Sequence, residues 1–340
     1  VFGIIQSTDY GWIKAKQMFN AFGVNWDFSG YSISIVSIII GLILLLIFMY
    51  WEARIESKGK TPLVSLKIFT NKQFNAGLAT SMVMSLGQAG LIFSIPVFIQ
   101  AVLGKDAFHT GLAMLPLSIA AFICAPLGGF LSHKIPPKYL VQFGLFLNFI
   151  GYLVLRNSFS TTATTSNLVL GLIILGSGMG FIMAQIGNIT MSAVSSKQAG
   201  EASGVSNTVR QLGSTLGTAV IGALLLTTLT NSMVDKVNAS EVFPEQFKER
   251  IVSEVSKSGD SLEFEASPNI NYGFPEKMPD FAKDLVKNEM KYIVSEATVD
   301  GNKVALWYAA WIAFIGVIVA SWLPKGTNIE KDDDISVKNK

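Results

Sequence analysis

The stretch from Gly200 to Leu226 reads GEASGVSNTVRQLGSTLGTAVIGALLL, and it decides the fold class. Beyond Glu201 it is apolar or small for long enough to cross a bilayer, which takes about 20 helical residues. Arg210 is the one charge well inside this stretch. At about 1.5 Å per residue, Arg210 lies roughly 13 Å along the helix from Glu201. A guanidinium is costly in hydrocarbon, so we expect Arg210 to face a bundle interior or a watery cavity.

Similar apolar stretches recur along the chain and account for most of its length. Half of the 340 residues are hydrophobic and 15% are charged, whereas ordinary soluble domains are about 25% charged. The sequence therefore predicts an all-α integral membrane protein, in preference to a large soluble helical protein. Net charge is only +2 and the basic residues are spread among short loops, so we expect no nucleic-acid partner. The predicted spans are 32–51, 75–98, 108–131, 138–156, 167–190, 202–228 and 304–323.

Basic residues in the connections predict the orientation. The connections that follow alternate spans are richer in Lys and Arg, and such segments remain in the cytoplasm. We therefore expect the C-terminus to be cytoplasmic. Val1 to Ile5 resembles the end of an apolar helix, so we also expect residues upstream of Val1. The predicted division is 1–12, the end of a truncated membrane helix; 13–31, an external loop; 32–51, a central membrane helix; 52–73, a cytoplasmic linker; 74–228, five membrane helices; 229–302, an external polar insert with two amphipathic helices; 303–324, the last membrane helix; and 325–340, a disordered cytoplasmic tail.

Two kinds of residue on the predicted helices are candidates for function. Polar and small residues around Arg210 recur at intervals of three and four, so they share one helix face. Such a stripe either lines a cavity that binds substrate or gates access, or it packs helices together, and Arg210 favours the first reading because packing needs no charge. The candidates for cavity or gating are Arg210, Asn207, Gln211, Gln185, Asn188, Gln88 and Asn148; those for helix packing are Gly176, Gly178, Gly180, Gly213 and Gly217.

The sequence lacks the residues that several classes of activity require. No Asp or Glu lies deep in any full span, no metal-ligand cluster or nucleophile set is evident, and there is no phosphate-binding loop. We therefore expect no enzyme activity, no cofactor and no ATP hydrolysis. A proton-carrying carboxylate, which proton-driven transporters typically use, would have to lie upstream of this chain.

Three stretches are the most specific motifs of the chain: Gly176–Gly180 (GSGMG), Gly200–Gly204 (GEASG) and Asn207–Gly213 (NTVRQLG). Together with shorter motifs spread over nearly the whole chain, they resemble the major facilitator superfamily, in particular its fourteen-span drug:proton antiporters of the EmrB/QacA type. Weaker matches are Tyr10–Trp12 (YGW), Trp51–Arg54 (WEAR), Pro62–Leu66 (PLVSL) and Pro96–Gln100 (PVFIQ). A cytoplasmic loop echoes the superfamily's gating motif through Gly129, His133, Lys134 and Lys138, although His133 stands where that motif carries an acid.

This resemblance implies a C-terminal six-helix bundle, preceded by the second central helix and the end of the first. It implies inverted three-helix repeats, alternating access and a proton gradient as the driving force. The implied setting is a bacterial plasma membrane, with the lipid bilayer, protons, amphipathic small molecules and a periplasmic adaptor protein as candidate partners. The alternatives are a transporter of one physiological solute such as a siderophore, peptide or sugar, a non-transporting sensor that uses the external insert, and a lipid-acting membrane enzyme.

Overall fold

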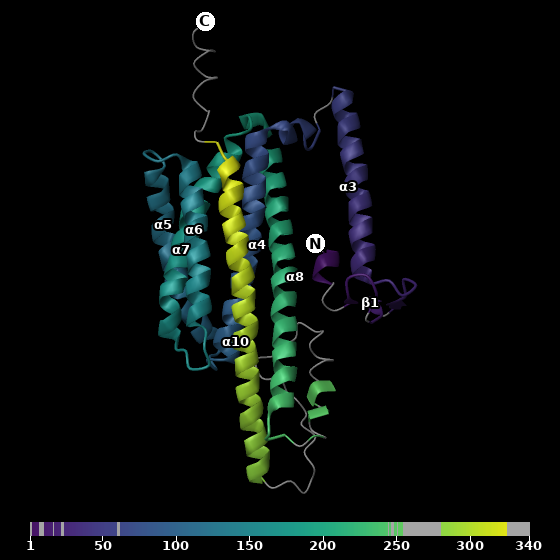
Figure 1. The fold of residues 1–340 in the computed structure, drawn as a ribbon. Helices are drawn as coiled ribbons and strands as arrows, with labels where there is room; N and C mark the ends of the chain where they lie inside the picture. The colour runs from purple at the N-terminus through teal and green to yellow at the C-terminus, as the bar shows by residue number, and fades with distance from the viewer. Residues whose placement is uncertain are drawn as a thin grey trace, which may run out of the picture.

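The chain folds into a bundle of long membrane helices, with one further helix standing beside it (Figure 1). The computed structural model describes residues 2–6, 10–15, 17–21, 24–59, 62–243, 245, 248–249, 251–253 and 280–324. Within these ranges, seven helices are long and apolar enough to cross a membrane, which confirms the predicted fold class. They are α3 (Ile33–Ser57), α4 (Lys72–Ala101), α5 (Ala107–Leu131), α6 (Pro137–Ser158), α7 (Thr165–Met191), α8 (Ala199–Ala239) and α10 (Asp280–Val319).

Short elements complete the fold. α1 (Phe2–Ile5) packs against α3, and β1 (Phe19–Ala21) pairs antiparallel with β2 (Val24–Trp26). This small hairpin lies inside the segment 13–31, for which only a loop was predicted. In the described ranges, the 3-10 turns are η1 (Leu66–Thr70), η2 (Ser196–Gln198) and η3 (Ala320–Trp322).

Local sequence sets where several helices begin. The Asn71 side chain accepts hydrogen bonds from the backbone N–H groups of Gln73 and Phe74, and so caps α4. Asp106 caps α5 in the same way through the N–H of His109, and Pro137 opens α6. These residues satisfy or avoid the free N–H groups of a first helical turn.

The bundle consists of two groups of three helices. α8 and α10 pack on α4, α5 and α6 pack on α7, and the groups meet where α10 contacts α6 and α4 contacts α7 (Figure 1). The two halves in sequence, α4 to α6 and α7 to α10, correspond to each other as α4 to α7, α5 to α8 and α6 to α10. Most contacts between two helices have an equivalent contact between their counterparts: α4 packs on α8 as α7 packs on α5, for example. This pattern is the one that an inverted repeat of three helices produces.

Glycine lets the central helices approach closely. A Cβ built on Gly213 would lie 2.5 Å from the Met82 carbonyl oxygen, and one on Gly180 would lie 2.7 Å from that of Ala121. The five glycines proposed for packing all sit at such contacts: Gly213 and Gly217 of α8 against α4, Gly176 and Gly180 of α7 against α5, and Gly178 of α7 against α6. Side chains at these positions would separate the paired backbones.

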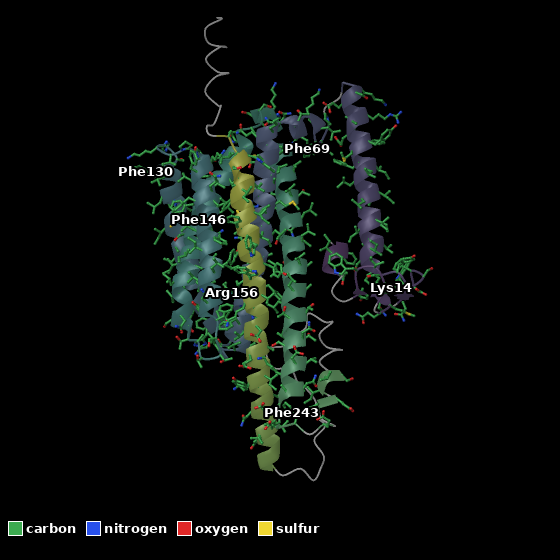
Figure 2. All side chains as sticks on the ribbon, in the orientation of Figure 1. Lys14, Phe69, Phe130, Phe146, Arg156 and Phe243 are labelled. Carbon is green, nitrogen blue, oxygen red and sulfur yellow. The ribbon has the colours of Figure 1, made fainter. Side chains whose placement is uncertain are left out.

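α3 stands apart from the bundle, and its side chains point outward along most of its length (Figures 1 and 2). Only 6% of its most apolar window is buried. Lipid solvates such a surface as well as protein does, so a membrane helix needs no protein partner on every face. The helix also continues to Ser57, beyond the end at residue 51 that the sequence suggested.

α8 and α10 continue well past the bundle as a two-helix hairpin (Figure 1). At about 1.5 Å per residue each helix is roughly 60 Å long, about twice the thickness of a bilayer core. The second amphipathic helix predicted for the insert 229–302 is therefore not separate: it is the first part of α10, which runs unbroken into the last span. Apolar contacts explain the continuity, since Met233 and Val237 of α8 belong to the same buried cluster as Met290 and Ile293 of α10.

Charged pairs also join the hairpin. Lys236 Nζ lies 2.8 Å from Glu296 Oε2 and 3.6 Å from Asp300 Oδ2. The hydrogen bond from Lys236, helped by one from Tyr292, lowers the pKa of Glu296, and the same carboxylate raises the pKa of Lys236. Most of the insert between the helices, and the tail predicted to be disordered, lie outside the described residues.

Candidate functional site

A cavity of about 410 Å³ opens between α4 and α8. It gathers four of the predicted site residues: Gln88 from α4 and Asn207, Arg210 and Gln211 from α8. The three positions on α8 fall within about one helical turn, which places them on one side of the helix. The remaining lining residues are Ser85, Ala89, Ile92 and Ser214.

The polar groups of this cavity are not used for packing. Among the described residues, no hydrogen bond engages the side chain of Asn207, Arg210 or Gln211, and no carboxylate lies within 4.0 Å of Arg210. Gln88 makes one weak contact, with Nε2 3.9 Å from the Met179 sulfur. Their hydrogen-bonding capacity is therefore directed toward whatever occupies the cavity.

A second cavity, of about 910 Å³, lies at the end of the bundle where α5 meets α6. It brings His133 and Lys134 of the connection together with Gln185 and Asn188 of α7. His133 and Lys134 are exposed, and the Lys134 ammonium sits 5.7 Å from the centre of the Phe130 ring. This end of the molecule is opposite the α8–α10 hairpin, as the labelled Phe130 and Phe243 show (Figure 2).

The amides of α7 differ in what they do. Gln185 is buried, and its Nε2 donates to the Gly128 carbonyl oxygen at 2.9 Å, which ties α7 to α5. Asn188 is exposed and makes only a long bond of 3.4 Å to the Ala184 carbonyl oxygen. Asn188 is therefore the freer of the two to contact a ligand, whereas Gln185 also holds the helices together.

The remaining predicted residues lie outside these groups. Asn148 of α6 is buried against Gly178 of α7, lines neither cavity, and its Oδ1 has no hydrogen-bond partner. Lys138 donates to the Ser321 carbonyl oxygen, which links α6 to η3, directly after α10. Gly129 has no neighbouring group within 4 Å of a Cβ built on it, so close packing does not require glycine there.

Sequence reasoning missed a pair of carboxylates that hold the linker between α3 and α4. Glu52 is only 2% exposed, and its Oε2 accepts from the backbone N–H of Leu63 at 2.7 Å. Glu201 at the start of α8 accepts from the backbone N–H of Ser65 at 2.9 Å. We call Glu52, Glu201 and the backbone of 63–65 the linker latch. The sequence did offer a signal for the linker latch, because both acids lie directly outside apolar spans and the linker contains Pro62.

Two buried polar contacts between helices were also missed. Tyr152 of α6 donates to the Gly87 carbonyl oxygen at 2.9 Å, one residue from Gln88. Ser94 of α4 donates to Asn302 Oδ1 of α10 at 2.5 Å, and both residues are fully buried. Each of these residues is a single polar residue in an apolar helix, which is visible in the sequence, but its partner is 65 or 208 positions away.

In the part of the chain that the structure describes, His, Cys, Asp and Glu form no group able to hold a metal ion.

The chain resembles bacterial transporters over most of its length. It is 26% identical over 298 residues to "Multidrug resistance protein Stp" of Mycobacterium tuberculosis, covering 84% of this chain and 52% of that protein. It is 30% identical over 228 residues to a "Probable actinorhodin transporter" of Streptomyces coelicolor, covering 66% and 36% of the two chains. "Multidrug transporter protein MdtP" of Bacillus subtilis is 30% identical over 185 residues, or 54% of this chain and 34% of that protein.

These matches cover between about a third and a half of the length of the curated relatives. A family model also matches the chain: residues 17–218, more than half of it, match the Major Facilitator Superfamily. This range includes every residue that lines the two cavities. Together with the helical architecture, the match shows that the chain belongs to the Major Facilitator Superfamily.

Proposed function

We propose that this chain forms the C-terminal part of a proton-driven exporter of amphipathic small molecules that works by alternating access. The observation that carries the proposal is the cavity between α4 and α8, where the side chains of Arg210, Asn207 and Gln211 make no described hydrogen bond and Gln88 makes one weak contact. In a membrane protein, an ionisable residue inside an apolar span usually marks a functional site, such as a transport pathway. The relatives named as multidrug transporters support the same reading.

The proton-coupling acid is proposed to lie upstream of this chain. None of the residues that line either cavity is an Asp or Glu. The carboxylates of Glu52 and Glu201 accept hydrogen bonds from the linker backbone. We place the protein in a bacterial plasma membrane with its C-terminus in the cytoplasm, on the strength of the basic connections at that end.

Efflux measurements on the complete gene test the proposal. In a host that lacks its own drug exporters, the wild type should lower the accumulation of amphipathic dyes, and a protonophore should abolish this effect. Arg210→Ala should reduce efflux at least tenfold, the consequence of losing about 1.4 kcal/mol of interaction, while membrane insertion stays normal. Efflux that persists without a proton gradient would refute proton coupling, and undiminished efflux by Arg210→Ala would refute the role of this cavity.

One relative supports a second candidate function, the export of a single physiological solute, because it is named for one compound. Growth protection across a panel of structurally unrelated compounds separates the two. Protection against several compounds supports the broad exporter, whereas protection against one supports the specific transporter.

For an adaptor partner, the α8–α10 hairpin is the proposed contact, since it projects beyond the bundle.

A further inference from the structure

We propose that the α4–α8 cavity selects amphipathic substrates that carry an anionic group, and that Arg210 binds this group. The inference rests on the proposed export function and adds the substrate class. Arg210 is the only charged residue among those lining this cavity. A carboxylate, sulfonate or phenolate bound there would complete a charge pair that the described part of the chain does not supply.

The absence of a nearby counter-ion carries the argument. No described carboxylate lies within 4.0 Å of Arg210. Glu201, the nearest acid along α8, lies roughly 13 Å away along the helix, and its Oε2 accepts from the Ser65 N–H. Arg210 therefore has no charged partner among the described residues. A cationic substrate group at the same place would meet repulsion, whereas an anionic group would be attracted.

The neighbouring groups suit an anion as well. The Arg guanidinium offers several N–H donors in a planar fork that matches the paired oxygens of a carboxylate or sulfonate. Asn207 and Gln211 lie beside it on α8, and each carries an amide NH2 that can donate to a further oxygen. These amides are without described hydrogen bonds, so binding would not break existing ones.

The cavity also offers a place for an apolar body. Ile92 of α4 lines the cavity and is 62% exposed, so its apolar side chain is available for contact. At about 410 Å³, the space falls within the range of sites for small molecules, roughly 300 to 1,000 Å³. The inferred substrate class is thus an aromatic or alkyl compound with one acidic group that is ionised at neutral pH.

Transport of two matched dyes tests this inference. N-phenylnaphthylamine is neutral, and anilinonaphthalene sulfonate shares its ring skeleton and adds a sulfonate. Uptake into energised inside-out vesicles that contain the complete transporter gives a KM and a kcat for each dye, and ethidium serves as the cationic probe. The wild type should favour the sulfonate over both others. Arg210→Gln should raise KM for the sulfonate roughly tenfold or more while changing KM for the neutral dye less than twofold.

Two further variants separate charge from structural effects. Arg210→Lys keeps the charge, so it should retain preference for the sulfonate with an intermediate KM. Arg54→Gln removes an exposed Arg near the end of α3, outside the cavity, and should leave the preference unchanged.

The outcomes distinguish this inference from the proposed function. If the wild type exports the dyes without charge preference, or if Arg210→Gln slows both dyes equally, the anionic selectivity is wrong while export stands. A preference for ethidium likewise overturns the selectivity alone. If the energised wild type transports none of the three dyes, both the export function and the selectivity fail.

Discussion

Removing the Glu201 carboxylate should release the linker between α3 and α4 without unfolding the bundle. In the linker latch, Glu201 Oε2 lies 2.9 Å from the Ser65 backbone nitrogen across 136 positions of sequence. A hydrogen bond to a charged group contributes roughly 1.5 to 3 kcal/mol. The site is partly buried, so we take the lower end, about 1.5 kcal/mol, which corresponds to roughly a tenfold change in a local opening equilibrium.

Hydrogen exchange measured by mass spectrometry on the complete transporter reads this equilibrium directly. In Glu201→Ala, amides of the linker peptide around Ser65 should exchange about tenfold faster, because exchange follows the local free energy of opening. The matched control is Glu241→Ala, since Glu241 is exposed and bonds to no described residue. Unchanged exchange around Ser65 would refute the latch. Faster exchange throughout α4, α8 and α10 would also refute it, because that pattern indicates global destabilisation.

Three further predictions concern packing and pH. Gly176→Val should lower the thermal stability or folded yield of the complete transporter strongly, because its side chain would meet the α5 backbone, whereas Gly129→Val should be tolerated in the same assay. Ser94→Ala should cost roughly 1 to 3 kcal/mol in denaturant unfolding, since it leaves the buried amide oxygen of its α10 partner unpaired. The Lys236–Glu296 pair should protect the hairpin most between about pH 5 and pH 10, by roughly 0.2 to 1 kcal/mol because both groups are partly exposed. Protection is lost as pH falls through the lowered pKa of Glu296 or rises through the raised pKa of Lys236, and a flat pH profile of hairpin hydrogen exchange would contradict this.

Several features of this protein could be predicted from sequence because they depend on local properties. A run of about 20 apolar residues forms a membrane helix wherever it occurs, and seven such helices are present in the described ranges. The spacing of Asn207, Arg210 and Gln211 also determines that they share one side of α8, whatever lies opposite. The motif around Arg210 pointed to the family that the chain belongs to.

The helix ends were harder to predict, because hydrophobicity stops at the membrane surface while a helix need not. α3 continues past Glu52, and α8 and α10 continue into the hairpin beyond the bundle. In each case contacts with another segment of the chain support the extension. Glu52 binds the backbone of the linker, and Met233 packs with Met290.

Only the tertiary structure decides which polar side chains form hydrogen bonds between helices and which face a cavity. Gln185 and Gln211 look equivalent in sequence, yet Gln185 bonds to the Gly128 backbone while Gln211 faces a cavity. Arg210 stood out in sequence by its charge, but the cavity that it shares with Gln88 exists only because α8 packs against α4. The physical reason is that these contacts join residues far apart along the chain. Local pattern places a side chain on a helix, and the packing of helices determines what that side chain meets.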